Sequence, residues 1–225
     1  MNNFLKLKNI SKSYKTEKTI KVLKGLSHNF EKGKIYSIMG PSGSGKSTLL
    51  NLISLIDRPS SGSIIIDDNQ INFNNTEEND IFRSKKIGIV YQQNNLLPDF
   101  TALENIYLAS LAVNNNKELA FTNAKKLINK IGLSKRSDHF PSQLSGGEAQ
   151  RVSIARAIVN DPEIILADEP TGSLDMETAK DIFELLNKQK RSDRLIIFAT
   201  HNRFFANKSD YLLEMRDGSI KSDNV

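Results

Sequence analysis

The chain has 225 residues, of which 38% are hydrophobic, so it is long enough to bury the core of one large domain. It contains no cysteine, which excludes disulfides and thiolate metal sites, and no apolar run reaches the roughly 18 residues of a membrane-spanning helix. The formal net charge is +5 with Lys and Arg dispersed along the chain, which favours a solvated surface over a nucleic-acid-binding tract.

Short β elements are predicted for the first part of the chain. Polar or charged side chains recur every few positions in residues 1–14, so we expect no export signal there. The apolar patterns predict strands at residues 4–7, 21–30 and 34–39 and a hairpin over residues 64–71.

A glycine-rich segment lies between the apolar run at residues 35–39 and a helix-like run at residues 49–56. It fits the phosphate-binding pattern G-x-x-x-x-G-K-[ST], in which backbone N–H groups curl around an anion and the following helix directs its positive end at it. A merely flexible glycine turn would not need the flanking strand and helix. Lys46 is expected to reach the β- and γ-phosphates, and Ser47 to bind Mg²⁺. The predicted nucleotide-binding residues of this loop are Gly40, Pro41, Ser42, Gly43, Ser44, Gly45, Lys46, Ser47 and Thr48.

The middle of the chain is predicted to be helical. Residues 72–80 are polar and aperiodic, which predicts a surface connection before a strand at residues 87–91. Farther along, one helical face collects the apolar residues Ala120, Ala124, Leu127 and Ile131. Gly132 then stands where a left-handed helix cap is expected, and a second helix is predicted over residues 148–159.

Two continuous apolar runs, at residues 164–167 and 195–199, are typical of parallel strands buried on both faces. An amphipathic helix separates them, with Ala179, Ile182 and Leu186 on its apolar face. Strand, helix and strand in this order predict a right-handed βαβ unit. We therefore expect an α/β fold, with residues 1–225 forming a single domain that carries a helical insertion at about residues 94–160.

Two carboxylates, Asp168 and Glu169, directly follow the run at residues 164–167. In α/β proteins, ligands bind at the carboxyl ends of the strands. Asp168 is predicted to orient the Mg²⁺ shell opposite Ser47, and Glu169 to polarise the water that attacks the γ-phosphate. Alone, such acids would be interpreted as solvated; a phosphate-binding loop in the same chain favours the catalytic interpretation.

The segment Leu144-Ser145-Gly146-Gly147-Glu148 predicts a second anion site, built from backbone N–H groups, a hydroxyl and a helix dipole. One chain with one phosphate loop has no obvious use for two such sites. This segment resembles the signature of the ATP-binding-cassette (ABC) ATPases, in which it closes over the γ-phosphate bound to the opposing subunit. The resemblance covers nearly the whole chain. It implies a P-loop NTPase (RecA-like) core with an N-terminal antiparallel β subdomain and an inserted helical subdomain.

The resemblance also implies roles for isolated residues. Tyr14 matches the aromatic residue that stacks on adenine, although alone it would be taken for a packing residue. Gln92, rather than Gln93, matches the glutamine that contacts Mg²⁺ and senses the membrane partner. Asp175 matches the aspartate of the dimer-communication loop and could also cap the helix that follows it. His201 matches the switch histidine that hydrogen-bonds the γ-phosphate.

Three positions depart from the family's usual pattern. Ala149 stands where many relatives have a basic residue, Asn202 where many have aspartate, and Ser173 where close relatives often have asparagine. None of these changes removes a phosphate-contacting or proton-handling group. They bear on subunit contacts and turnover rate more than on the reaction itself.

Residues 96–106 and 213–218 resemble the lipoprotein-releasing ATPases of the Lol exporter. This resemblance implies a peripheral ATPase at the cytoplasmic face of the inner membrane, which binds ATP and Mg²⁺, pairs with a second copy of itself and couples to integral membrane permease subunits. Neither the transported substrate nor nucleic acid would contact the chain. The alternatives are a related cell-division or macrolide-efflux complex and, less favoured, a soluble ABC ATPase acting on nucleic acid or ribosomes.

Overall fold

The computed structural model describes residues 3–15 and 17–224, which divide into two compact units. The first unit contains the described residues up to Arg83 and again from Lys190 onward. The second unit runs from Ser84 to Gln189. The glycine-rich loop therefore belongs to the first unit, and the acidic pair after the buried strand belongs to the second.

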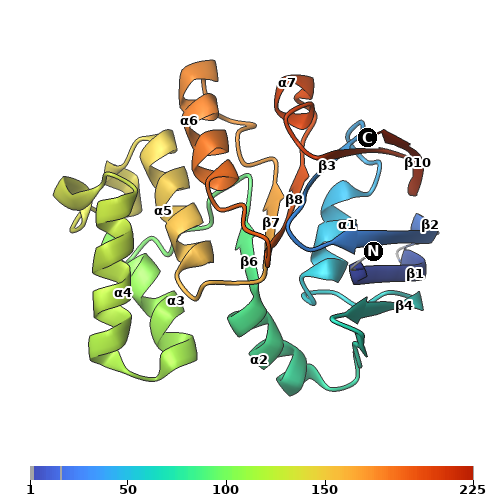
Figure 1. The fold of residues 1–225 in the computed structure, drawn as a ribbon, viewed down its shortest axis with the longest axis horizontal. Helices are drawn as coiled ribbons and strands as arrows, with labels where there is room; N and C mark the ends of the chain where they lie inside the picture. The colour runs from blue at the N-terminus through green and yellow to red at the C-terminus, as the bar shows by residue number, and fades with distance from the viewer. Residues whose placement is uncertain (1–2, 16, 225) are drawn as a thin grey trace. The chain divides into compact units, whose positions relative to one another are not determined.

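An antiparallel sheet of order β2-β1-β4-β5 forms one part of the first unit. Its strands are β1 (Asn3–Lys15), β2 (Thr19–Glu31), β4 (Ser61–Ile66) and β5 (Asn69–Gln70). Figure 1 shows β1, β2 and β4 side by side. The predicted hairpin is confirmed, because β4 and β5 pair through a turn in which Asp67 and Asp68 both adopt positive φ angles, of 51° and 60°. Aspartate tolerates this left-handed region better than most residues.

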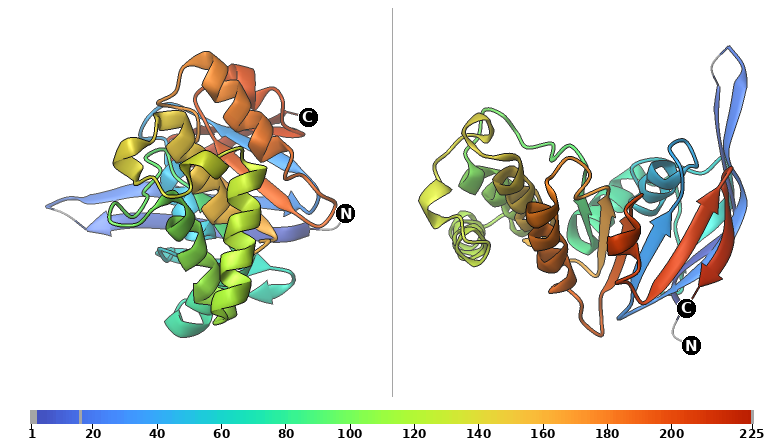
Figure 2. Two further views of the ribbon diagram at one scale, coloured as in Figure 1. Left: turned by 90° about the vertical axis from the view of Figure 1, so that its left-hand side faces the viewer. Right: turned by 90° about the horizontal axis from the view of Figure 1, so that it is seen from above.

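A second set of strands in the first unit has the order β10-β9-β3-β8. These strands are β3 (Ile35–Met39), β8 (Leu195–Ala199), β9 (Tyr211–Arg216) and β10 (Ser219–Asn224). Strand β3 pairs in parallel with both β8 and β9, and β10 returns antiparallel to β9 (Figure 2). Every residue of β8 is buried, as its continuous apolar run predicts.

Helices α1 and α7 lie near the ends of these strands. Helix α1 (Lys46–Ile53) follows β3, and its residues Leu49, Leu52 and Ile53 are fully buried. The short helix α7 (Arg203–Ala206) follows β8 and is capped by the side chain of Asn202. The carboxyl ends of β3 and β8 thus lead directly into the glycine-rich loop and into His201.

The predicted surface connection at residues 72–80 is wrong in part, because helix α2 (Thr76–Lys86) begins inside it. The Asn75 side chain accepts a hydrogen bond from the Glu78 amide at 3.3 Å and donates one to the Glu78 carboxylate at 2.8 Å. Only Asn79 of this helix is buried. The helix therefore lacks the apolar periodicity on which a sequence-based prediction depends.

The second unit contains the parallel strands β6 (Ile87–Val90) and β7 (Ile164–Asp168), with Ile87 opposite Ile164. Its helical elements are α3 (Ala102–Asn114), α4 (Lys117–Lys130), the 3₁₀ turns η1 (Ser134–Arg136) and η2 (Pro141–Gln143), α5 (Gly146–Ile158) and α6 (Met176–Asn187). Helices α3, α4 and α5 lie together and share one hydrophobic core (Figures 1 and 2). The predicted apolar face is confirmed, since Ala120 and Ala124 are fully buried, and Gly132 has the predicted positive φ, at 78°.

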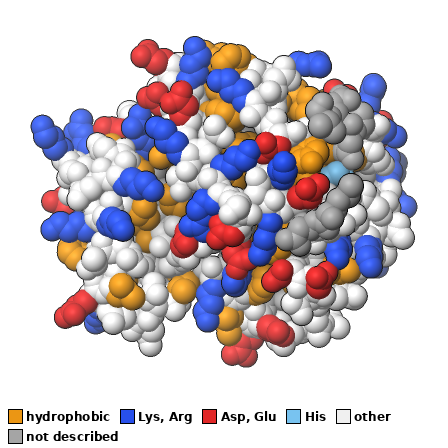
Figure 3. Space-filling model, viewed as in Figure 1, with side chains coloured by type: hydrophobic (Ala, Val, Ile, Leu, Met, Phe, Trp, Pro, Cys, Tyr) orange, Lys and Arg blue, Asp and Glu red, His pale blue; other side chains and the backbone are white. Residues whose placement is uncertain are grey.

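Charged side chains are spread over the surface shown in Figure 3, where lysines and arginines alternate with acidic residues. They form no continuous basic tract on this face. Within residues 3–15 and 17–224, no helix is both long enough and apolar enough to cross a membrane.

Candidate active site

The glycine-rich loop connects β3 to α1, and the surrounding backbone leaves room only for glycine at its first position. A Cβ added to Gly40 would lie 2.1 Å from the Met215 carbonyl oxygen, which is a steric clash with the backbone of β9. Gly43 and Gly45 adopt positive φ angles of 78° and 103°, which other residues rarely adopt. Nothing lies within 4 Å of a Cβ built on Gly43, so this part of the loop faces open space.

Polar groups in this loop are arranged to bind an anion. The Lys46 ammonium is buried and donates hydrogen bonds to the carbonyl oxygens of Gly40 at 2.7 Å and Pro41 at 3.2 Å. Ser44 Oγ is also buried, and no described residue hydrogen-bonds to it. Helix α1 has Gly45 at its N-cap, without a side-chain cap or an acidic residue in its first turn. A phosphate group would satisfy these donors and the helix dipole together.

His201 lies near the start of this loop. It lines a cavity of about 620 Å³ together with Met39, Gly40 and Pro41. The remaining lining residues come from the C-terminal strands. The side chain of His201 is exposed, so it can contact a ligand bound at this end of β3 and β8.

Tyr14 lies on β1 in a polar environment. Its hydroxyl donates a 2.9 Å hydrogen bond to Asp57 Oδ2, and it also contacts the hydroxyl of Thr48 in the first turn of α1. Partial burial, together with the hydrogen bond to Asp57, raises the pKa of Tyr14. The ring is 39% exposed, which leaves an aromatic surface next to the helix that begins at the glycine-rich loop.

Asp168 ends β7, and Glu169 begins the turn after it. Glu169 has a φ angle of 47°, in the left-handed region that costs a residue with a side chain about 1–2 kcal/mol. The Glu169 carbonyl accepts a 3.0 Å hydrogen bond from the Gly172 amide, which closes the turn. A Cβ on Gly172 would lie 3.2 Å from Gln92 Nε2 and 3.5 Å from Glu169 Cβ. The structure therefore brings Gln92 and Glu169 to the same turn of the second unit.

The second predicted anion site forms the N-terminus of α5. Ser145 Oγ accepts a hydrogen bond from the Glu148 amide at 3.2 Å, and the Glu148 carboxylate accepts one from the Ser145 amide at 2.8 Å. This capping box lowers the pKa of Glu148, chiefly through the hydrogen bond from the Ser145 amide. A Cβ on Gly147 would lie 2.4 Å from Thr178 Cγ2, so Gly147 also allows close packing of α5 against α6.

Asp175 caps α6, which confirms the second of the two roles proposed for it. Its side chain accepts hydrogen bonds from the amides of Glu177 at 3.1 Å and Thr178 at 3.0 Å. Hydrogen bonding from Thr178 is the main cause of its lowered pKa. Because Gly147 approaches Thr178, the loop of Asp175 and the N-terminus of α5 lie close together in the second unit.

Two side chains of α5 hold the loop that follows β6. The sequence alone assigned neither of them a role. Gln150 Nε2 donates to the Tyr91 carbonyl at 3.1 Å. The Arg156 guanidinium donates to the carbonyl oxygens of Asn94 at 2.8 Å and Asn95 at 2.7 Å. Desolvation by burial lowers the pKa of Arg156. No local sequence signal reveals such contacts, because the partners are backbone atoms about sixty residues away.

The predicted site residues fall into two groups. The glycine-rich loop, Tyr14 and His201 belong to the first unit, and the others belong to the second unit. No cluster of three His, Cys, Asp or Glu side chains that could hold a metal occurs in the described parts of the chain. The predicted magnesium ligands are instead a hydroxyl, an amide and a carboxylate, a donor set that fits Mg²⁺ when phosphate and water oxygens complete the shell.

A family model described as ABC transporter matches residues 23–172. Lipoprotein-releasing system ATP-binding protein LolD from Rickettsia bellii is 42% identical over 221 residues, which cover 97% of this chain and 98% of the relative. Macrolide export ATP-binding/permease protein MacB from Mannheimia succiniciproducens is 40% identical over 98% of this chain, but the match covers 34% of that relative. A dimeric post-hydrolysis structure of the ATP-binding cassette MJ0796, bound to ADP and Pi, has a TM-score of 0.91 at 39% identity and covers 98% of this chain and 97% of its own. The predicted fold class is thereby confirmed, and the chain belongs to the ABC transporter family.

Proposed function

We propose that the chain is the ATP-hydrolysing subunit of an inner-membrane ABC transporter that releases lipoproteins. The glycine-rich loop carries the ATPase assignment, because a buried lysine, a buried serine hydroxyl without a described partner and an uncapped helix N-terminus converge there. The end-to-end match to lipoprotein-releasing relatives supports the choice of transporter. The macrolide exporters are 40% identical over 98% of this chain, but the match covers only about a third of a longer ATP-binding/permease protein.

The predicted site residues of the first unit each have a role in holding the nucleotide. The amides of the loop and of the first turn of α1 bind the phosphates, and Lys46 exchanges its two carbonyl partners for the β- and γ-phosphate oxygens. Tyr14 stacks on the adenine. His201 contacts the γ-phosphate from the end of β8 and senses whether it is present.

Hydrolysis depends on the carboxylates of the second unit. Glu169 accepts a proton from the attacking water, and its left-handed backbone fixes the direction of its side chain. Ser47, Gln92 and Asp168 would hold Mg²⁺, which neutralises the charge that develops on the phosphate oxygens. The contact between Gln92 and the turn after Glu169 supports a role for Gln92 in linking the magnesium shell to the position of the base.

The N-terminus of α5 completes the site of a second copy of the chain. Ser145 Oγ accepts its hydrogen bond from Glu148, which leaves its O–H free to donate to a γ-phosphate oxygen of the partner's nucleotide. Gly146 and Gly147 allow the phosphate to approach the backbone amides. The dimeric state of the MJ0796 cassette with ADP and Pi supports this arrangement. Asp175, next to this surface, communicates between the two copies.

The membrane partner contacts the loop that precedes α3. Leu97 and Phe100 are 42% and 38% exposed there, which offers apolar surface to a permease segment. The buried Asn105 fixes this loop, because its side chain exchanges hydrogen bonds with the backbone of Leu97 and donates to the carbonyl of Phe100. The chain acts from the cytoplasmic face as a peripheral subunit and does not touch the transported lipoprotein.

Depletion of the chain in its own host tests the transporter assignment. We expect lipoproteins to accumulate in the inner membrane, and expression of the wild-type chain, but not of Glu169→Gln, to restore their release. A septation defect or macrolide sensitivity with normal lipoprotein sorting would contradict lipoprotein release and favour the cell-division or macrolide-export alternative. Co-purification with ribosomes or nucleic acid in place of a membrane protein would reject both transporter assignments.

A further inference from the structure

A partly buried ion pair next to Tyr14, formed by Lys12 and Asp57, takes no part in the roles assigned so far. Lys12 on β1 is only 8% exposed, although a charged side chain is costly to bury. Its ammonium lies 2.5 Å from Asp57 Oδ1 and donates a 2.8 Å hydrogen bond to the Arg58 carbonyl. By contrast, the ion pair of Lys6 and Asp68 in the same sheet leaves its carboxylate 85% exposed.

The same pair fixes Tyr14 in two ways. The second oxygen of the Asp57 carboxylate accepts the hydrogen bond from the Tyr14 hydroxyl at 2.9 Å. The Lys12 ammonium also lies over the Tyr14 ring, 4.8 Å from its centroid, in cation–π geometry. Tyr14 is therefore held at its hydroxyl and against one face of its ring.

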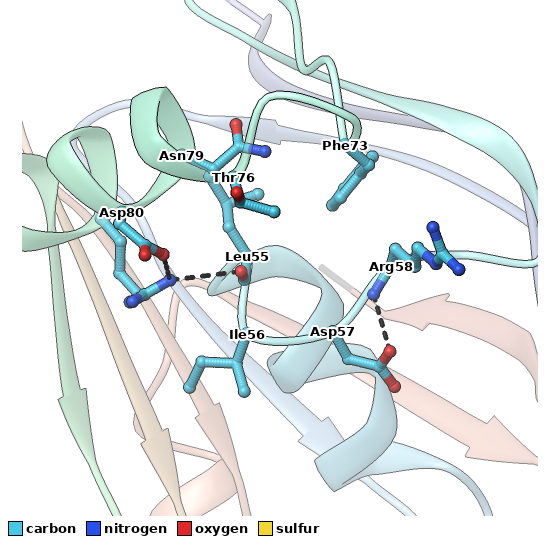
Figure 4. Close-up of a pocket in the computed structure, with 9 residues that line it drawn as sticks. Leu55, Ile56, Asp57, Arg58, Phe73, Thr76, Asn79 and Asp80 are labelled. Atoms are coloured by element: carbon cyan, nitrogen blue, oxygen red, sulfur yellow. Dashed lines mark hydrogen bonds and ion pairs between the residues drawn. The ribbon is translucent and has the colours of Figure 1, made fainter.

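Asp57 lies in a segment held by several hydrogen bonds. Residues 55–58 follow α1 and line a cavity of about 490 Å³ (Figure 4). Leu55 has a positive φ of 60°, and its carbonyl accepts a 3.3 Å hydrogen bond from Arg83, which also pairs with Asp80 at 2.8 Å. The Arg58 amide donates to Asp57 Oδ1 at 2.7 Å. The carboxylate is thus oriented by two groups other than Tyr14, the Lys12 ammonium and the Arg58 amide.

Asp57 keeps its negative charge at neutral pH. Its partial burial raises the pKa, but the hydrogen bonds from Lys12, from the Arg58 amide and from Tyr14 outweigh this effect and lower the pKa below its ordinary value. A charged acceptor binds a phenol hydroxyl more strongly than a neutral one does.

We propose that Lys12 and Asp57 are positioning residues that fix the Tyr14 ring in the orientation that stacks on the nucleotide base. This inference rests on the proposed adenine contact of Tyr14. The base stacks on the ring face opposite Lys12, and the ring loses no rotational freedom on binding because the pair already holds it. Helix α1 begins at the phosphate-binding loop and ends just before the segment of Asp57, so one helix joins the phosphate site to the base site.

A comparison of ATP with inorganic tripolyphosphate, each with magnesium, isolates the base contact, because only ATP can contact Tyr14. Tyr14→Phe keeps the ring and removes its hydrogen bond to Asp57. The double variant Lys12→Met/Asp57→Ala removes both charges together, so that neither is left buried without a partner. Lys6→Met/Asp68→Ala is the matched control, because it removes an ion pair of the same sheet that does not contact Tyr14.

We expect Tyr14→Phe and Lys12→Met/Asp57→Ala each to weaken ATP binding about 3- to 10-fold, which is the effect of one lost hydrogen bond and one released side chain. Tripolyphosphate affinity should not change. Combining the two sets of substitutions should weaken ATP binding no further than either set alone, because both disrupt the same contact. The control pair should match the wild type for both ligands.

Equal loss of affinity for ATP and tripolyphosphate in Lys12→Met/Asp57→Ala would overturn the inference, because the pair would then act only on the fold. A second result would also overturn it: Lys12→Met/Asp57→Ala binds ATP as tightly as the wild type, whereas Tyr14→Ala weakens the binding of ATP but not of tripolyphosphate. A failure of the proposed function would give a different result: Lys46→Ala would bind ATP and tripolyphosphate with the same affinity as the wild type. If Tyr14→Ala does not affect ATP selectively, the base contact and the positioning role are both rejected.

Discussion

Substitution of Gly147 by alanine should destabilise the chain, and Thr178→Ser should reverse the loss. The new Cβ would lie 2.4 Å from Thr178 Cγ2, about 1 Å closer than an ordinary van der Waals contact. Overpacking of this kind costs about 1–3 kcal/mol, which corresponds to a lowering of the Tm by about 2–12 °C in a chain of this size. Thr178→Ser removes the clashing methyl group and keeps the hydroxyl that contributes to the hydrogen bonding of Asp175.

Thermal unfolding followed by circular dichroism measures this effect in Gly147→Ala, in Thr178→Ser and in the double variant. The double variant should recover most of the lost Tm. ATPase activity gives a separate readout: if Gly147 also faces the partner's phosphate, the double variant remains slow although it is stable. A Gly147→Ala variant with the Tm of the wild type would refute the packing argument, and full activity of the double variant would refute the phosphate contact.

Three further predictions concern the phosphate-binding loop, the catalytic base Glu169 and the stability of the fold at low pH. Lys46→Ala should weaken ATP binding itself, because the loop loses the cation that pairs with the phosphates; unchanged affinity in a calorimetric titration would remove Lys46 from its role. Glu169→Gln should retain ATP binding and lose roughly 10²- to 10⁴-fold in hydrolysis, so near-normal phosphate release would exclude Glu169 as the base. Asp57 has a lowered pKa in the folded state, so the unfolded state takes up the proton first as the pH falls. The stability that Asp57 contributes is therefore present above about pH 4 and lost below it, and the Tm of Lys12→Met/Asp57→Ala should depend less on pH between about 5 and 3 than that of the wild type; parallel curves would contradict this.

Apolar periodicity and the positions of glycine and capping residues in the sequence predicted the helices and turns that depend on neighbouring residues. The buried face of α4 and the left-handed Gly132 follow from periodicity and from glycine's conformational range, and the cap at Asp175 follows from its position before an amphipathic helix. Helix α2 was missed because its only buried residue is Asn79, so no apolar face marks it. Its start depends on the side chain of Asn75, which equally suits a turn.

The site was predicted less completely than the fold. The phosphate-binding loop is recognisable because glycine, lysine and serine at fixed spacing leave few other interpretations. The contacts of Arg156 with the backbone after Gln92, and of Asp57 with Tyr14, join residues far apart in the chain. Asp57 in particular follows a helix and precedes Arg58 and a proline, a context that indicates only a turn.

The central claim is that two copies of the chain hold ATP between the phosphate-binding loop of one and the N-terminus of α5 of the other. Sedimentation of Glu169→Gln with and without MgATP tests it most directly. We expect a dimer with one ATP per chain when nucleotide is present, a monomer when it is absent, and a monomer that still binds ATP when Ser145→Arg is added. A variant that stays monomeric at saturating ATP, or a dimer unaffected by Ser145→Arg, would contradict the account.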